Sequence, residues 1–278
     1  MLKSTPLKKG IIGALKLNLI FLIEGITRQF FRFTPNSFPR FLERAAADAQ
    51  GKGYGSTSIR QEIEIISRLL VKPPQLAMDI GGNVGDYSAE LRRRFSDLEI
   101  HTFEPSNVNI EKLNTRFSLD PLIKIAPWAV SDKVGSAILF SDTPGSGLAR
   151  LTKRKLEHFN IHLDDEQVVP TIRFESYWQK ELRSRQIDIV KIDIEGHELA
   201  ALEGFGSAID RVSVLQFEFG GCNIDTRTFF QDFWNFFNQK DFAMLRITPT
   251  GFDEIKSYRE IDEFFSTTNY IAKNRRIL

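Results

Sequence analysis

A glycine-rich turn that carries acidic residues is the first feature of the chain that could do chemistry. Residues 79–86 read Asp-Ile-Gly-Gly-Asn-Val-Gly-Asp and begin inside the apolar run 76–80. Glycine lets a backbone turn tightly and approach a ligand closely. The dinucleotide fingerprint needs further glycines two and five residues after the first, but counting from Gly81 these positions hold Asn83 and Asp86. A diphosphate would also meet the carboxylates of the turn, so the turn favours a ligand without phosphate.

Glu104 adds a second group that could bind this ligand. It follows the next apolar run, 99–103, where an acid can accept hydrogen bonds from both hydroxyls of a ribose. A solvated carboxylate at the end of a strand is the alternative interpretation. A nucleoside without phosphate suggests S-adenosylmethionine, and the acidic turn suits its sulfonium and ammonium charges.

Polar side chains interrupt two later apolar runs that otherwise have the composition of buried strands. They alternate with apolar residues, so within each run they face one side of the strand. Ligands of open α/β sheets bind beyond the carboxyl ends of the strands, so we expect these groups to lie beside the glycine turn. A structural ion pair between the lysine and a neighbouring acid is the alternative. The residues are Lys191, Asp193 and Glu195 in one run and Gln216 and Glu218 in the next.

His197 follows directly, where the next helix is expected to begin. A helix N-terminus disfavours the imidazolium form, so a neutral His197 could act as a general base. A capping or solvated histidine is the alternative. Asp193, Glu195 and Glu218 could also bind a hard divalent cation such as Mg²⁺ through oxygen ligands, but three acids on two strands do not by themselves favour a metal site.

The elements that must position these residues alternate between strand and helix, which predicts a doubly wound, mostly parallel sheet. Residues 131–170 break this alternation, and we interpret them as a hairpin with an inserted loop or cap. Residues 270–273 are expected to form a closing edge strand. The predicted strands are 76–80, 99–103, 123–130, 187–194, 212–219 and 242–247, and the predicted helices are 84–95, 106–118, 197–205 and 226–239.

The N-terminal part has a different character and is predicted to be a basic, helical extension over residues 1–70, followed by one domain over residues 71–278. Residues 1–44 contain eight Lys or Arg and two Glu, in a chain whose formal net charge is +1. Charged residues interrupt the apolar stretch 11–33, so it falls short of a transmembrane helix. Three interpretations remain: an amphipathic helix packed on protein, a membrane-surface helix with basic flanks, or a cleaved signal peptide.

Composition excludes several classes of protein. A hydrophobic share of 42% and a charged share of 26% are typical of a soluble globular chain and exclude a disordered or multi-span membrane protein. The low net charge gives no basic field for nucleic acid. The lone Cys222 excludes a disulfide framework and a cysteine-rich zinc site. We therefore expect a cytoplasmic protein without a nucleic-acid partner, and contact with a membrane surface through residues 1–44 stays one of the open alternatives.

From about residue 76 to residue 219, the chain resembles the FkbM-type methyltransferases, a family of S-adenosylmethionine-dependent Rossmann-like enzymes. The motifs that carry the resemblance are MDIGGNVGDYS, TFEPSNVNIEKLN, APWAVSD and, most specifically, IDIVKIDIEGHELAALEGF. The resemblance implies the class I methyltransferase fold and methyl transfer from S-adenosylmethionine to a hydroxyl of a sugar, glycan or secondary metabolite. The chain has Gly82 where alanine is frequent in the family, which we expect to be a mild change.

The resemblance also implies roles for individual residues. The methionine and ribose would be lined by the glycine turn, the ribose hydroxyls would bind Glu104, and three further residues would lie near the adenine. The KIDIEGHE segment supplies the candidate catalytic residues. The implied cofactor residues are Asp79, Gly81, Asn83, Gly85, Glu104, Ser106, Trp128 and Ala129, and the catalytic candidates are Asp193, Glu195 and His197.

Other functions remain as alternatives. A non-catalytic binding or scaffold protein could keep this fold, although every expected cofactor residue is present. A nucleotide-sugar or dinucleotide enzyme is disfavoured by the failed phosphate fingerprint. A nucleic-acid methyltransferase is disfavoured further, because the part of the chain after residue 44 is acidic.

Overall fold

The computed structural model describes residues 26–27, 29–31, 34–54 and 58–278. Its contacts divide the chain into two units, Met1–Ala47 and Asp48–Leu278. This boundary lies earlier than the one predicted after residue 70, because helix α3 (Ile59–Leu69) buries Ile63 and Ile66 in the core of the second unit. Most of the predicted apolar helix over 11–33 lies outside the described residues. In the part of the chain that is described, no helix is long and apolar enough to cross a membrane.

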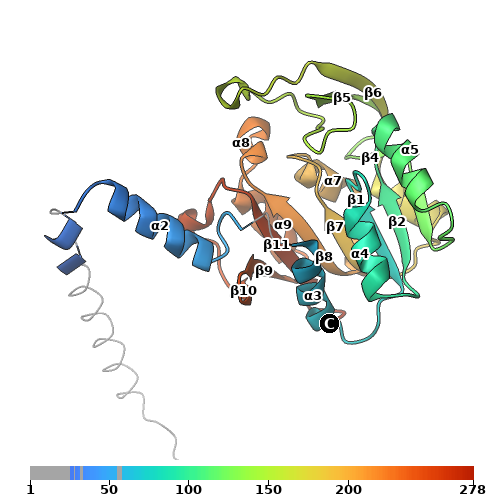
Figure 1. Cartoon of the computed structure of the whole chain (residues 1–278). Helices are drawn as coiled ribbons and strands as arrows, with labels where there is room; N and C mark the ends of the chain where they lie inside the picture. Colours follow the sequence, from blue (N-terminus) through green and yellow to red (C-terminus); the bar gives the residue numbers. More distant parts are fainter. Residues whose placement is uncertain (1–25, 28, 32–33, 55–57) are drawn as a thin grey trace, which may run out of the picture. The chain divides into compact units, whose positions relative to one another are not determined.

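The second unit is built on an eight-stranded sheet with the order β10-β9-β11-β8-β7-β1-β2-β3 (Figure 1). The five strands β3, β2, β1, β7 and β8 are parallel neighbours, whereas β11 runs antiparallel to both β8 and β9. The predicted doubly wound, mostly parallel fold is confirmed. The strands are β1 (Leu76–Ile80), β2 (Glu99–Phe103), β3 (Ile123–Ala126), β7 (Ile187–Ile192), β8 (Val212–Phe219), β9 (Phe242–Thr248), β10 (Gly251–Ile255) and β11 (Thr268–Asn274).

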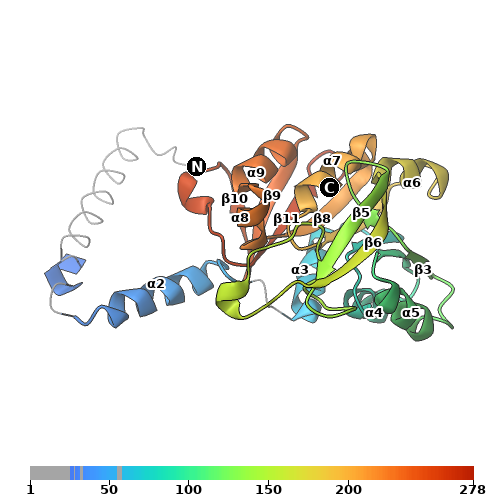
Figure 2. The ribbon, with the colours of Figure 1, turned by 90° about the horizontal axis from the view of Figure 1, so that it is seen from above.

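Helices cover both faces of this sheet. Figure 2 shows α3, α4 and α5 on one side and α6, α7 and α9 on the other. Strand β1 is buried along its whole length, with Ala77 in the core under α3 and α4 and Met78 in the opposite core. Burial on both faces explains why the parallel strands read as continuous apolar runs. The further helices are α4 (Asp86–Arg94), α5 (Asn107–Arg116), α6 (Phe174–Lys180), α7 (Glu198–Gly204), α8 (Cys222–Thr226) and α9 (Phe230–Asn238).

Several predicted elements are divided or displaced in the structure. The run 123–130 separates into β3 and a short strand β4 (Ala129–Val130), which belongs to a second sheet. The predicted helix 226–239 corresponds to α9, which begins later than predicted, at Phe230. The prediction of an edge strand at 270–273 is wrong, because β11 lies between β8 and β9 and the edge is formed by β10.

The predicted insert at 131–170 forms a hairpin, as expected. Strands β5 (Gly135–Ser141) and β6 (Asp165–Ile172) pair antiparallel, and β4 pairs with β6. Residues 142–155, which we call the strap, follow β5. They lie over the carboxyl ends of the central strands and line a cavity together with them. Figure 1 shows β5 and β6 at the same end of the sheet. This insert therefore supplies one wall of the cavity described below.

Candidate active site

The glycine turn lies between β2 and β7, at the carboxyl end of β1. The amides of Gly81 and Gly82 both donate to the carbonyl of Phe103, at 2.9 and 3.0 Å. A side chain at Gly81, where φ is +87°, would place its Cβ 1.9 Å from the carbonyl oxygen of Asp193. Only glycine fits where the two backbones approach so closely. The contact lies between β1 and β7, where the strand order of the sheet reverses. Open α/β sheets bind their ligands at this point.

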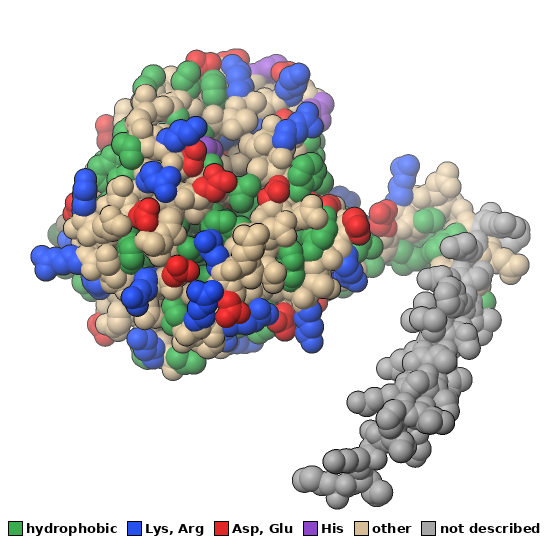
Figure 3. All heavy atoms as spheres, turned by 180° about the vertical axis from the view of Figure 1, so that it is seen from behind, with side chains coloured by type: hydrophobic (Ala, Val, Ile, Leu, Met, Phe, Trp, Pro, Cys, Tyr) green, Lys and Arg blue, Asp and Glu red, His purple; other side chains and the backbone are tan. Residues whose placement is uncertain are grey.

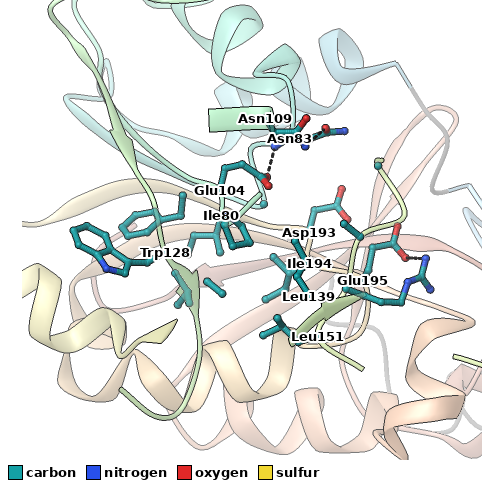
Figure 4. Close-up of a pocket in the computed structure, with 18 of the residues that line it drawn as sticks. Ile80, Asn83, Glu104, Asn109, Trp128, Leu139, Leu151, Asp193, Ile194 and Glu195 are labelled. Carbon is teal, nitrogen blue, oxygen red and sulfur yellow. Dashed lines mark hydrogen bonds and ion pairs between the residues drawn. The ribbon is translucent and has the colours of Figure 1, made fainter. Parts of the chain in front are cut away.

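A cavity opens there (Figure 4). It is bounded by the glycine turn, the ends of β2 and β7, the segment before β4, and the insert. We call it the main cavity. Its walls include Gly81, Asn83, Phe103, Glu104, Asn109, Trp128, Ala129, Leu139, Gly147, Arg150, Leu151, Asp193, Ile194 and Glu195.

Glu104 is held at the wall of this cavity by backbone amides. Its Oε2 accepts from the amide of Asn83 at 2.8 Å, and its Oε1 accepts from the amide of Ser106 at 2.9 Å. Burial raises the pKa of Glu104 to about 7, although these hydrogen bonds favour the ionised form. Asn109, which sequence reasoning missed, donates to the Asn83 side chain at 3.0 Å and steadies the turn.

The predicted adenine side of the cavity is apolar. Trp128 and Ala129 line it together with Phe103 and Leu139, and the Trp128 ring meets Tyr177 edge to face with centroids 6.1 Å apart. Ser106 does not line the cavity, because it is buried and acts through its amide on Glu104. Gly85 does not line it either; its φ of +86° turns the chain into α4.

Asp193 borders the main cavity and a second, polar cavity of about 670 Å³ on the other side of the glycine turn. Its carboxylate lies 2.9 Å from Lys191 Nζ, so the ion pair considered as an alternative is present. Burial opposes the charge of Lys191, but Asp193 and other nearby carboxylates outweigh it and raise the lysine pKa. The second cavity is lined by Glu62, Asp79, Gly81, Gly82, Asn83, Asp86, Tyr87, Lys191, Asp193 and Asn269, among others.

Asp79 lies in this second cavity rather than in the main one. It is almost completely buried and accepts from Ser88 Oγ at 2.6 Å. Burial raises its pKa, and the hydrogen bond and Lys191 partly offset that rise. Gln216 is engaged nearby in a buried network: it donates to Glu62 at 2.6 Å and accepts from Tyr87 at 3.2 Å. Gln216 is therefore not a free ligand-binding group, contrary to the expectation that it joins Glu218 at the site.

Glu195 is held at the cavity wall by a residue of the insert. Arg150 is buried, and its Nη2 lies 3.2 Å from Glu195 Oε2. The thiol of Cys222 also donates to this oxygen, at 2.9 Å. Arg154 forms a second bridge from the strap, to Asp225 on α8. Sequence reasoning missed these two arginines, because the insert contains no motif that indicates which carboxylates it meets.

His197 points away from both cavities. Its Nε2 lies 2.9 Å from Ser131 Oγ, and it is not among the residues that line either cavity. Burial lowers its pKa, and the charge of Asp132 partly opposes this, so the neutral form is favoured as expected. The geometry nevertheless gives this imidazole no path to a ligand in the main cavity.

Glu198, which the sequence analysis did not single out, shapes the loop before α7. Its Oε1 accepts from the amides of Ile194 and Gly196, both at 3.1 Å, and burial raises its pKa to about 7. Glu195 adopts a φ of +58° in this loop, a conformation that needs such support. Glu198 thus positions Glu195 at the cavity.

Glu218 lies beside these carboxylates on β8. Burial raises its pKa well above the usual range, and Asp193, Glu195 and Glu198 raise it further. The three acids considered as cation ligands do not form a metal-binding group: within the described ranges, no cluster of three or more His, Cys, Asp or Glu has suitable geometry.

The sheet order and the site at its switch point define a Rossmann-like, class I methyltransferase fold. The sequence profile of the methyltransferase FkbM domain matches residues 79–244. The chain therefore belongs to the FkbM methyltransferase family, as its motifs predicted. No match was found among curated proteins.

Solved structures include several methyltransferases with distant similarity. The FkbM methyltransferase of Methylobacillus flagellatus is 17% identical, with a TM-score of 0.46 over 74% of this chain and 45% of that one. The chain thus spans less than half the length of that relative. An O-methyltransferase of Bacillus cereus, solved in complex with SAH, is 12% identical, with a TM-score of 0.42 over 87% of this chain and 93% of that one. An rRNA methylase of Streptococcus thermophilus is 12% identical, with a TM-score of 0.42 over 79% of this chain and 97% of that one.

Proposed function

We propose that the chain transfers a methyl group from S-adenosylmethionine to a hydroxyl of a small polar or glycan acceptor. The observation that carries the proposal is the main cavity, which places the Glu104 carboxylate, an apolar wall at Trp128 and the carboxylate of Asp193 around one space. Family membership supports methyl transfer in general. The choice of a hydroxyl acceptor is our inference from the site.

The residues present fit this cofactor. Each oxygen of Glu104 accepts one backbone amide and retains a lone pair for a ribose hydroxyl. The apolar wall at Trp128 and Leu139 suits an adenine ring. The second cavity, with carboxylates beside Lys191, suits the charged amino-acid end. When bound, S-adenosylmethionine supplies an activated methyl group for an acceptor oxygen to attack.

Asp193 is the best-placed residue to receive the proton that the acceptor hydroxyl loses. It lines both cavities at their common edge. Its bond to Lys191 orients the carboxylate and leaves its second oxygen for the hydroxyl. Glu195, fixed by Arg150, would accept a hydrogen bond from the acceptor and help to align it; such alignment supplies much of the acceleration in a displacement reaction. We do not assign a proton transfer to His197, because it faces Ser131.

The charges at the site also bear on the acceptor. Asp193 and Glu195 line the main cavity at the carboxyl ends of the parallel strands, each beside one cation, Lys191 or Arg150. Carboxylates accept hydrogen bonds from hydroxyls but repel anions, so an uncharged polyol or sugar fits this surface better than a phosphorylated or carboxylated acceptor. Chains of nucleic acid are disfavoured for the same reason.

Calorimetric titration of the full chain with S-adenosylmethionine and S-adenosylhomocysteine tests the proposal first. We expect binding, and we expect Glu104→Gln to weaken it while the variant stays folded. Incubation with S-adenosylmethionine labelled in the methyl group and a panel of glycosides, with and without Mg²⁺, then tests transfer. Failure of the folded chain to bind either compound would contradict the proposal and favour the scaffold alternative. Transfer only to amines or nucleic acid would contradict the hydroxyl assignment.

A further inference from the structure

The N-terminal unit carries an aromatic patch that takes no part in the proposed reaction. The patch consists of Phe30, Phe31, Phe38, Phe41 and Leu42. The rings of Phe30, Phe31 and Phe38 contact one another with centroids 5.9 to 6.3 Å apart. Phe30 is nevertheless 55% exposed and Phe41 64% exposed. Exposed aromatic side chains gathered in this way indicate an interaction surface.

Helix α2 (Ser37–Ala49) presents the patch residues Phe38, Phe41 and Leu42 along one side. Phe38, Phe41, Leu42 and Ala45 recur at spacings of three and four residues, which places them on one face of a helix. None of the residues of α2 is buried. Arg40 and Arg44 lie on the same helix outside that stripe. Figure 3 shows hydrophobic side chains at the surface of this segment.

Charge distinguishes the kinds of partner that could cover the patch. Residues 1–44 contain eight basic and two acidic residues, a local charge of +6, whereas the whole chain carries only +1. A second copy of the unit would bring the same positive charge against it. An anionic lipid surface supplies both an apolar phase for the phenylalanines and negative charge for the lysines and arginines.

We propose that the patch and its basic residues dock the chain on the surface of an anionic membrane, without crossing it. The phenylalanine rings enter the boundary between headgroups and acyl chains, where aromatic side chains are favoured. The lysines and arginines of residues 1–44 add electrostatic attraction to the anionic headgroups. The inference does not depend on the identity of the methyl acceptor.

Co-sedimentation of the full chain with lipid vesicles tests this proposal. We expect binding to phosphatidylcholine vesicles that contain phosphatidylserine, weak binding to phosphatidylcholine alone, and release by added salt. The double substitution Phe38→Asp with Phe41→Asp should lower the partition coefficient by about tenfold or more. The matched control is Phe159→Asp in the insert, because Phe159 is 65% exposed and lies outside the patch.

Three outcomes would overturn the proposal. They are equal binding of the double variant and the unsubstituted chain, equal binding to neutral and anionic vesicles, and no binding to either. Self-association in the absence of lipid that the double variant abolishes would instead assign the patch to a second copy. Circular dichroism of each variant shows that it is folded, and each variant is then titrated with S-adenosylmethionine. A failure of the proposed function would appear there without altering the vesicle result.

Discussion

At the scale of single residues, the site depends on a few carboxylates whose surroundings differ sharply. Glu104 is supported by two amides, Asp193 by a lysine, and Glu195 by a buried arginine. The residue types were visible in the sequence, but their partners were not. Because the partners differ, we expect these carboxylates to differ in their pKa and in the effect of their substitution on binding and turnover.

Binding of S-adenosylmethionine should weaken as the pH falls through about 7. Burial raises the pKa of Glu104 to about 7, and two ribose hydroxyls can donate only to the ionised carboxylate. The bound ligand therefore favours the deprotonated form, so binding releases a proton, and affinity is lost by up to about tenfold per pH unit below the pKa. Calorimetry across this pH range should show the effect in the unsubstituted chain. The Glu104→Gln variant should bind more weakly and show a flatter profile; an unchanged profile would assign the titration to another group.

Asp193→Asn and His197→Ala should separate the two candidate bases. Loss of the carboxylate that receives the proton should lower kcat by about 10² to 10⁴, while the Kd for S-adenosylmethionine changes little. His197→Ala removes a hydrogen bond to Ser131 and should cost about 1 kcal/mol of stability with kcat preserved. The measurement is single-turnover methyl transfer alongside urea unfolding. The reverse ranking of kcat would restore His197 as the base.

At the scale of elements, the glycine turn fits its neighbours more tightly than the family pattern suggested. A Cβ at Gly82 would lie 2.1 Å from Cγ2 of Thr102, which is fully buried on β2. Alanine, the residue that is frequent at this position in the family, would therefore clash in this chain. The sequence does not reveal which side chain of the next strand fills the space.

Gly82→Ala should destabilise the chain by about 1 to 3 kcal/mol through overpacking. Thr102→Ser removes the clashing methyl group and keeps the hydroxyl that contacts Ser88 at 2.8 Å. In the Thr102→Ser background, Gly82→Ala should therefore lower the free energy of unfolding much less than it does alone. A double-mutant cycle of unfolding free energies measures this coupling. An additive cycle would show that the turn moves instead of clashing.

Arg150 of the insert lines the main cavity and pairs with Glu195. We therefore expect this ion pair to affect the Kd for S-adenosylmethionine. Arg150→Met removes the buried cation that pairs with Glu195 and leaves this carboxylate uncompensated, so we expect the Kd for S-adenosylmethionine to rise by roughly tenfold. The control is Lys153→Met, because Lys153 pairs with Glu166 on the same insert but both side chains are about half exposed. Equal effects of the two variants would mean that Arg150 acts only on the stability of the insert.

At the scale of the whole molecule, the two units separate the proposed chemistry from the proposed membrane contact. Every residue that lines either cavity lies after Ala47. A chain that begins at Asp48 keeps α3 and its core contacts. We expect it to bind S-adenosylmethionine as the full chain does and to lose affinity for anionic vesicles. Loss of cofactor binding in this folded chain would contradict the separation.

The sequence alone determined the fold class and most of the strands, and it indicated where the candidate site lies. Parallel strands buried on both faces must be continuously apolar, so β1, β7 and β8 were recognisable, and the glycines and acids that interrupt them stood out. The tertiary structure decided which of these residues meet. It turned His197 toward Ser131, engaged Gln216 with Glu62, placed β11 inside the sheet, and brought Arg150 to Glu195. Such contacts join residues far apart in the chain, and local periodicity carries no information about which of them come together.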